Sequence, residues 1–370
     1  MTTEMMKRAG HYVSQPSGYC AFLPAPLPPR PPIMMDAELR ALLAKAEQSI
    51  ARLNESMRAA KCLVPMYMRK EALASSQIEG IQATLRQLLM AEAHCDTSCI
   101  PKEVKEVANY VKAMQYGLDG SEFSLRLVKK THQILMREKR HALPGKWRTV
   151  QNWIGPAGCS LRRATFVPPP PSEIEGAMKA LGAFLEADAG HPALIQIGLA
   201  HGQFETIHPF VDGNGRVGRL LITLLLAERA GLAQPALYIS EFIKCHREEY
   251  YRRLQAIRDV GDWEGWLAFF LRGICATAEH AMQMAADALR LHEDCTSTVH
   301  ARLGRIGTRV IKKLIDQPIV RKSTVQTWLG ENAHKSDQVI STLSEAGVLA
   351  AIDCRCLCFE PYIQLLEKGL

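Results

Sequence analysis

The chain has 370 residues, of which 47% are hydrophobic, and a formal net charge of +7 at pH 7. This length predicts two or three compact domains with ample hydrophobic core. The longest apolar run, 220–227, is interrupted by Thr223 and is too short to cross a bilayer, and the proline-rich residues 1–30 do not resemble a signal peptide. The eleven cysteines lack framework spacing. We therefore expect a reducing, cytoplasmic location and no membrane association.

Amphipathic periodicity dominates the chain and predicts a mostly α-helical fold. Proline and glycine residues separate the predicted helices. In chain order, the helices are expected over residues 36–60, 65–92, 103–117, 124–137, 172–188, 192–206, 216–230, 244–258 and 262–290. The main exception is a predicted hairpin, because residues 150–154 favour a strand and Gly155, Pro156 and Gly158 favour a turn.

The last seventy residues follow a different pattern. Helical runs at 307–316, 323–329 and 335–346 precede short apolar segments at 348–352 and 357–359. Three helices and a short hairpin resemble a winged helix-turn-helix, which makes DNA binding one interpretation. The run at 335–346 contains no arginine for reading bases, so protein interaction or dimer support is favoured over sequence-specific DNA binding.

Three alternating cysteines in this region, Cys354, Cys356 and Cys358, could suggest a zinc site. Alternation is typical of one face of a β-strand, and no second His/Cys pair stands at finger-like spacing. We therefore expect a strand and no zinc.

The most informative stretch, residues 208–219, reads HPFVDGNGRVGR. His208 titrates near neutrality and can take a proton from a hydroxyl group. Asp212 is a hard oxygen ligand of the kind that Mg²⁺ prefers beside substrate phosphates. Gly213 and Gly215 flank Asn214, which permits a tight turn and close approach of backbone N–H groups to an anion.

This turn leads into the helix predicted from Arg216, and helix N-termini favour phosphate. Arg216 and Arg219 lie three residues apart in its first turn, where guanidinium groups can clamp phosphate oxygens. A plain turn with surface arginines is the alternative. The combination of a histidine, a carboxylate and two arginines favours nucleotide chemistry instead.

The stretch matches the motif HxFx(D/E)GNGRxxR of the Fic family at every defined position, and the chain resembles that family over residues 65–290. Fic proteins transfer AMP from ATP to a hydroxyl side chain of a target protein. The resemblance implies a Fic-type helical core with a β-hairpin flap at about 147–170. A chain similar to the Doc toxin, which binds its nucleotide in reverse, would phosphorylate instead.

The resemblance assigns His208 as general base, Phe210 as apolar anchor of the loop and Asp212 as ligand of Mg²⁺. It also implies a set of nucleotide contacts, which comprises Glu79, Gly213, Asn214, Gly215, Arg216, Val217, Gly218, Arg219, Tyr251 and Leu254. An adenine-contacting asparagine of some relatives is Arg258 in this chain.

A second motif, Ser75-x-x-x-Glu79-Gly80, places Ser75 and Glu79 on one face of a helix. By itself it is typical of an ordinary surface helix. Beside a Fic core it resembles the inhibitory motif (S/T)xxxE(G/N), which implies that Glu79 pairs with Arg219 and occupies the space of the γ-phosphate. In some relatives the same glutamate positions a water for removing AMP.

The resulting expectation is an autoinhibited protein adenylyltransferase that uses ATP and Mg²⁺ and binds target proteins along the flap. Its predicted divisions are an N-terminal helical region (1–100), the Fic core (101–292) and the winged-helix-like domain (296–370). A homodimer is implied by the resemblance. The alternatives are a de-AMPylase, another nucleotidyl transfer on the same site, or an ATP-sensing DNA-binding regulator.

Overall fold

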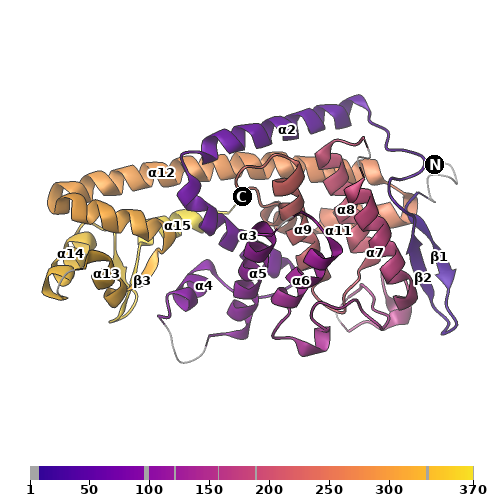
Figure 1. The fold of residues 1–370 in the computed structure, drawn as a ribbon, viewed down its shortest axis with the longest axis horizontal. Helices are drawn as coiled ribbons and strands as arrows, with labels where there is room; N and C mark the ends of the chain where they lie inside the picture. The colour runs from indigo at the N-terminus through magenta and orange to yellow at the C-terminus, as the bar shows by residue number, and fades with distance from the viewer. Residues whose placement is uncertain are drawn as a thin grey trace.

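The computed structural model describes residues 8–95, 100–120, 122–156, 158–187, 190–330 and 333–369. Helices predominate, and two small sheets lie at opposite ends of the molecule (Figure 1). The α-helices are α2 (Ala37–Met57), α3 (Val64–Ile78), α4 (Leu85–Glu92), α5 (Lys102–Leu118), α6 (Leu125–Leu135), α7 (Pro171–Glu186), α8 (Ala193–Ile207), α9 (Asn214–Arg229), α10 (Ser240–Cys245), α11 (Arg247–Val260), α12 (Trp263–Asp316), α13 (Lys322–Leu329), α14 (Ala333–Glu345) and α15 (Glu360–Leu366). The strands are β1 (Gly10–Ser14), β2 (Cys20–Pro24), β3 (Ile319–Arg321), β4 (Ala350–Ala351) and β5 (Cys356–Cys358).

The predicted mostly helical fold is confirmed, with corrections at several helix ends. The single helix predicted over 65–92 is two helices, α3 and α4, because Gly80 adopts a left-handed φ of 82° between them. The helix predicted over 244–258 is likewise two, since His246 leaves helical geometry between α10 and α11. The helix predicted to end at 290 continues to Gly304, whose non-helical dihedral angles divide α12.

Two parts of the fold were not predicted. Strands β1 and β2 form an antiparallel hairpin within residues 1–30, which are proline-rich and for which no strand was predicted. Helix α15 follows the last strand, and β3 completes a three-stranded sheet in the order β3-β5-β4. The predicted C-terminal hairpin is present as the β4–β5 pair.

Helix α8 is the buried centre of the helical body. Its residues from Leu194 to Ile207 are all buried, so it lacks a polar face. Glycine allows α12 to approach closely, because a methyl group on Gly198 or Gly202 would collide with Leu267 or Trp263. Trp266 donates its indole N–H to the Gly198 carbonyl at 2.8 Å, which satisfies a polar group that would otherwise be buried without a partner.

Helices α2 and α12 run side by side along one edge of the molecule (Figure 1). The buried stripe of α2 repeats every three or four residues and includes Leu39, Leu43, Ile50, Leu53 and Met57. This spacing turns one helix face toward α12. Among the described helices, none is both long and apolar enough to cross a membrane.

The C-terminal sheet and α15 are attached to the α4 region by several side-chain contacts, which include an ion pair and a disulfide. Arg86 makes a bidentate ion pair with Glu360, at 2.8 and 2.9 Å from its two carboxylate oxygens. Cys95 and Cys356 form a disulfide, which the expectation of a reducing location did not anticipate. In the described part of the chain, no group of three or more His, Cys, Asp or Glu residues could hold a metal ion.

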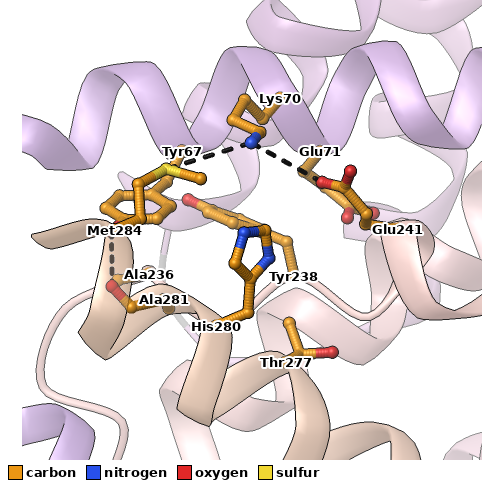
Figure 2. A pocket seen from close by; sticks show the side chains of 10 residues that line it. All are labelled: Tyr67, Lys70, Glu71, Ala236, Tyr238, Glu241, Thr277, His280, Ala281 and Met284. Carbon is orange, nitrogen blue, oxygen red and sulfur yellow. Dashed lines mark hydrogen bonds and ion pairs between the residues drawn. The ribbon is translucent and has the colours of Figure 1, made fainter. Parts of the chain in front are cut away.

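A buried carboxylate lies within the helical body on α3. Glu71 is 1% exposed and accepts hydrogen bonds from the Ser240 hydroxyl, from the Ser240 backbone N–H at 3.2 Å and from Tyr110 at 3.4 Å. Figure 2 shows Lys70 beside it, reaching Glu241 and the Met284 sulfur. Burial raises the pKa of Glu71 to about 7, although its hydrogen bonds to Ser240 favour the charged form.

Glu71 should make the folded protein less stable as the pH rises. Its folded-state pKa exceeds the usual 4.5, so stability falls between about pH 4.5 and pH 7, where the carboxyl ionises in the unfolded chain but keeps its proton in the folded protein. The loss is at most about 3 kcal/mol, since each pKa unit corresponds to about 1.4 kcal/mol. We expect Glu71→Gln to lose less stability than the wild type between pH 5 and pH 8 in urea unfolding. Parallel losses in both proteins would contradict this prediction.

Candidate nucleotide-binding site

The loop that joins α8 to α9 begins and ends with left-handed residues. His208 caps α8 with φ 50° and ψ 59°, and its backbone N–H still donates to the Phe204 carbonyl at 2.9 Å. Gly213 caps the start of α9 with φ 84°. Left-handed geometry costs a histidine more than a glycine, so the surrounding contacts must hold His208 in place.

Asn214 supplies one of those contacts by tying the loop to itself. Its side-chain oxygen accepts from the Phe210 N–H, and its side-chain amide donates to the Phe210 carbonyl, both at 2.8 Å. Phe210 is fully buried. Its ring therefore packs the loop against the core.

His132 of α6 is a second support, which the sequence reading missed. Its ring stacks on Phe210 with centroids 3.6 Å apart. Nδ1 accepts from the Gly145 N–H at 2.9 Å, so Nε2 carries the proton and donates to the Asp212 carbonyl at 3.0 Å. Burial lowers the pKa of His132 to about 4, which keeps this tautomer neutral at pH 7.

Arg148 and Asn152 fasten the loop from the flap side. Arg148 is 2% exposed and donates from Nε to the His208 carbonyl at 3.0 Å and from Nη1 to the Val150 carbonyl at 3.1 Å. Asn152 donates to the Phe210 carbonyl at 2.9 Å. The sequence reading placed both residues in the flap without assigning them a role. Sequence spacing alone could not show that Arg148 is buried and contacts a loop sixty residues later.

The His208 imidazole is a neutral base. Burial, and then the nearby charges of Arg258 and Arg148, lower the pKa of His208 to about 3. The ring therefore carries no proton charge at neutral pH and keeps one nitrogen lone pair free. This arrangement can accept a proton from a hydroxyl group.

Helix α9 begins at Asn214, two residues earlier than predicted, so its first-turn N–H groups lie directly after the loop. Gly213 donates its N–H to the Asp212 side chain at 2.6 Å. A methyl group on Gly215 would overlap the Glu79 carboxylate. The absence of a side chain at Gly215 thus leaves room for an anionic group beside the helix N-terminus. The Glu79 carboxylate fills that room in this structure.

Arg219, one turn into α9, is 1% exposed and is held by Ser75 and Glu79 of the Ser75-x-x-x-Glu79-Gly80 motif. Its Nε donates to the Ser75 hydroxyl at 2.9 Å, and Nη2 donates to the Ser75 carbonyl and to Glu79, each at 2.8 Å. Burial opposes ionisation, but the Glu79 carboxylate outweighs it and the pKa of Arg219 is raised. The structure therefore brings Ser75 and Glu79 of one sequence motif into contact with Arg219 of the other.

Arg216 points to a different set of partners. It is buried, and its guanidinium lies 3.1 Å from Glu106 and 3.7 Å from the Asp212 carboxylate. Lys139 bridges the same two carboxylates at 2.8 and 3.6 Å. Glu106 and Lys139 were not predicted as part of this site.

The Asp212 side chain is 43% exposed and accepts the Gly213 N–H just before α9 begins. One accessible carboxylate is a poor site for a resident metal. It fits Mg²⁺ that is held jointly with substrate phosphates and water, which is the usual protein environment of this ion.

The remaining predicted nucleotide contacts are more dispersed. Val217 and Leu254 are buried in the core, and Gly218 presents its backbone carbonyl to His201 at 3.0 Å. Tyr251 on α11 is 41% exposed. Burial and then the Glu79 charge raise the pKa of Tyr251, so its hydroxyl lies within electrostatic range of the inhibitory residue.

The flap contains the predicted hairpin, although it is reduced to one bridged pair. Ile154 and Phe166 exchange two backbone hydrogen bonds of 2.9 and 3.0 Å. Phe22 of β2 donates to the Val167 carbonyl at 2.9 Å, so the N-terminal hairpin lies against the flap. Val150 and Trp153 expose 57% and 41% of their surfaces.

Comparison with known proteins agrees with this geometry. The family model described as "Fic/DOC family N-terminal" matches residues 40–119, and the model described as "Fic/DOC family" matches residues 122–226. Together they span half of the chain.

Among curated proteins, the chain is 29% identical over 218 residues to "Protein adenylyltransferase Fic" of Drosophila grimshawi, covering 56% of this chain and 40% of the relative. It is 32% identical over 143 residues to the protein of the same name from Culex quinquefasciatus, covering 38% of this chain and 24% of that one. The chain thus spans less than half the length of these relatives.

A solved structure of a Fic family protein from Desulfovibrio desulfuricans superposes with a TM-score of 0.61 at 20% identity, covering 89% of this chain and 97% of that one. A Fic domain containing signaling protein from Bacteroides thetaiotaomicron gives a TM-score of 0.50 at 19% identity, covering 69% and 97%. These likenesses concern the fold. With the two family models and the geometry of residues 208–219, they show that the chain belongs to the Fic/DOC family.

Proposed function

We propose that the protein is an adenylyltransferase that transfers AMP from ATP to a hydroxyl side chain of target proteins. The observation that carries the proposal is the juxtaposition of a neutral His208 with the N-terminus of α9, whose approach the Glu79 carboxylate now fills. A base for the hydroxyl proton and a binding site for phosphate lie at the two ends of one fixed loop. The names of the curated relatives supply the reaction class.

In the proposed reaction, His208 accepts the proton of the target hydroxyl as its oxygen attacks the α-phosphorus of ATP in line. The bond from the α-phosphorus to the bridging oxygen breaks, and pyrophosphate leaves as a phosphodiester forms on the target. The backbone N–H groups of Asn214 and Gly215 stabilise the charge on the phosphates, and the Gly213 N–H joins them once it leaves the Asp212 side chain. Asp212 would hold Mg²⁺, which neutralises phosphate charge when bound.

Glu79 inhibits this reaction in the proposed resting state. Its carboxylate takes one donor of Arg219 and lies against Gly215, where the terminal phosphate would approach. ATP can bind productively only after that carboxylate moves away. A hydrogen bond to a charged group is worth about 1.5–3 kcal/mol, and Glu79 is 35% exposed. The contact is therefore strong enough to inhibit and weak enough to be displaced.

Target proteins bind along the flap at about 147–170 in this proposal. Exposed Val150 and Trp153 provide apolar contacts beside a backbone that can pair with an extended segment.

The C-terminal residues 296–370 form a winged-helix-like domain that supports protein interaction, consistent with the absence of arginine from α14. A homodimer is part of the proposal by resemblance alone, and a cytoplasmic location is part of it because the cysteines lack framework spacing.

Labelled ATP tests the reaction. With magnesium, we expect the protein to become labelled from α-labelled but not from γ-labelled ATP. Glu79→Gly should raise labelling about 10- to 100-fold, which corresponds to the loss of one charged hydrogen bond. Glu79→Gln keeps the side chain's shape without its charge and should fall in between.

His208→Ala is the control for chemistry and should abolish labelling from α-labelled ATP in every background. Labelling from the γ position would mean that the nucleotide binds in reverse and that the protein is a kinase. Labelling that survives in His208→Ala would contradict the assigned base.

Replacing Asn214 tests whether the loop geometry contributes to ATP binding beyond its contribution to the stability of the fold. Asn214→Ala removes both hydrogen bonds to Phe210 and should cost roughly 1–3 kcal/mol of stability, with weaker ATP binding. The matched control is Asn54, which makes two similar bonds to a distant loop, with Gly231 and Ala233. Asn54→Ala should lose stability but keep its ATP affinity in calorimetry. Equal losses of affinity would refute a specific role for Asn214.

A further inference from the structure

A buried carboxylate lies next to the catalytic loop and has no role in the chemistry described so far. Glu205 is 5% exposed and is three residues before His208 on α8. Among the residues that the structure describes, neither Glu205 Oε1 nor His208 Nδ1 has a hydrogen-bond partner, although both atoms are buried. Glu205 Oε2 lies 3.9 Å from that Nδ1. The carboxylate and the ring nitrogen thus face each other at a distance just beyond a hydrogen bond, and the Glu205 backbone carbonyl also interacts with the ring.

The surroundings are built to accommodate this carboxylate. A methyl group on Gly218 would overlap Glu205 Oε1, so glycine leaves it room. The neighbouring guanidinium groups bind elsewhere: Arg219 is engaged by Ser75 and Glu79, and Arg258 donates to the Glu205 backbone carbonyl at 3.1 Å and stacks on Phe166. Burial raises the pKa of Glu205 to about 7, and the charges of Arg219 and Arg258 oppose this rise without occupying the carboxylate oxygens.

We propose that Glu205 is the positioning residue of His208, a role that rests on the adenylyltransferase function proposed above. The Glu205 carboxylate accepts the Nδ1–H of His208, so the lone pair on Nε2 is left to receive the target's proton. When that proton arrives, the imidazolium keeps its Nδ1–H on Glu205. Glu205 itself takes up no proton, and Nε2 releases its proton to solvent after transfer.

This role answers a difficulty in the site's electrostatics. Burial and two nearby arginines lower the pKa of His208 to about 3, which leaves the histidine neutral but a weak proton acceptor. A carboxylate beside Nδ1 stabilises the imidazolium as it forms, as an oriented acid group does in other histidine bases. The titratable and charged groups that surround the pair are Arg148, Arg219, Arg258, Glu79, Asp212 and Tyr250.

Nitrogen NMR of the full-length protein with ¹⁵N-labelled histidine rings tests this assignment without relying on activity. His208→Ala identifies the His208 signals. We expect wild-type His208 to carry its proton on Nδ1, and Glu205→Gln to lower its pKa or mix its tautomers. Glu205→Asp should restore part of the wild-type signature. His201, whose two ring nitrogens contact Gly218 and Tyr250, should not change.

Kinetics provides the second readout. Glu205→Gln should lower kcat for AMP transfer about 10- to 100-fold, with little change in KM for ATP and with an altered pH profile. The matched control is Glu71→Gln, which removes another fully buried carboxylate and should leave the His208 signals and the kcat unchanged.

The NMR and kinetic results separate the two proposals. Unchanged His208 tautomer, pKa and kcat in Glu205→Gln would overturn the positioning role. If the wild type transfers no AMP at all, the proposed function fails, while the NMR comparison still decides whether Glu205 orients His208.

Discussion

The structure of the site depends on how the buried charge of Arg219 is compensated. A guanidinium that is 1% exposed requires partners on every side, and the chain supplies them from α3 through Ser75 and Glu79. These contacts join the helix before the Fic core to the helix that carries the phosphate-binding N-terminus. Glu79 occupies one donor of Arg219, so in the proposed function a phosphate reaches that guanidinium only by replacing Glu79.

The loop is fixed independently of that contact. Asn214 closes it from within, His132 and Phe210 stack beneath it, and Arg148 holds its first carbonyl from the flap. A loop held at several points keeps its geometry whether Glu79 is present or displaced, and preorganised donors of this kind need little rearrangement during reaction. Inhibition can therefore act by occupying the site rather than by distorting it.

Much of the site could be predicted from local spacing. Residues 208–219 form one continuous stretch of loop and helix start, and Ser75 and Glu79 are four residues apart, so local spacing indicates which side chains lie together. His132, Glu106 and Arg148 could not be predicted, because they reach the loop from distant segments and their types are common elsewhere. The break between α3 and α4 was not predicted, because an isolated glycine such as Gly80 can occur within a helix. Its left-handed φ, which ends α3, is visible only in the structure.

The measurement that tests the account most directly is calorimetry of ATP and AMP binding to the wild type and Glu79→Gly. Because Glu79 occupies the approach of the terminal phosphate alone, the account predicts that Glu79→Gly tightens ATP binding by about tenfold or more while AMP affinity hardly changes. An equal effect on both nucleotides, or none on either, would contradict the claim that Glu79 competes with the γ-phosphate for Arg219.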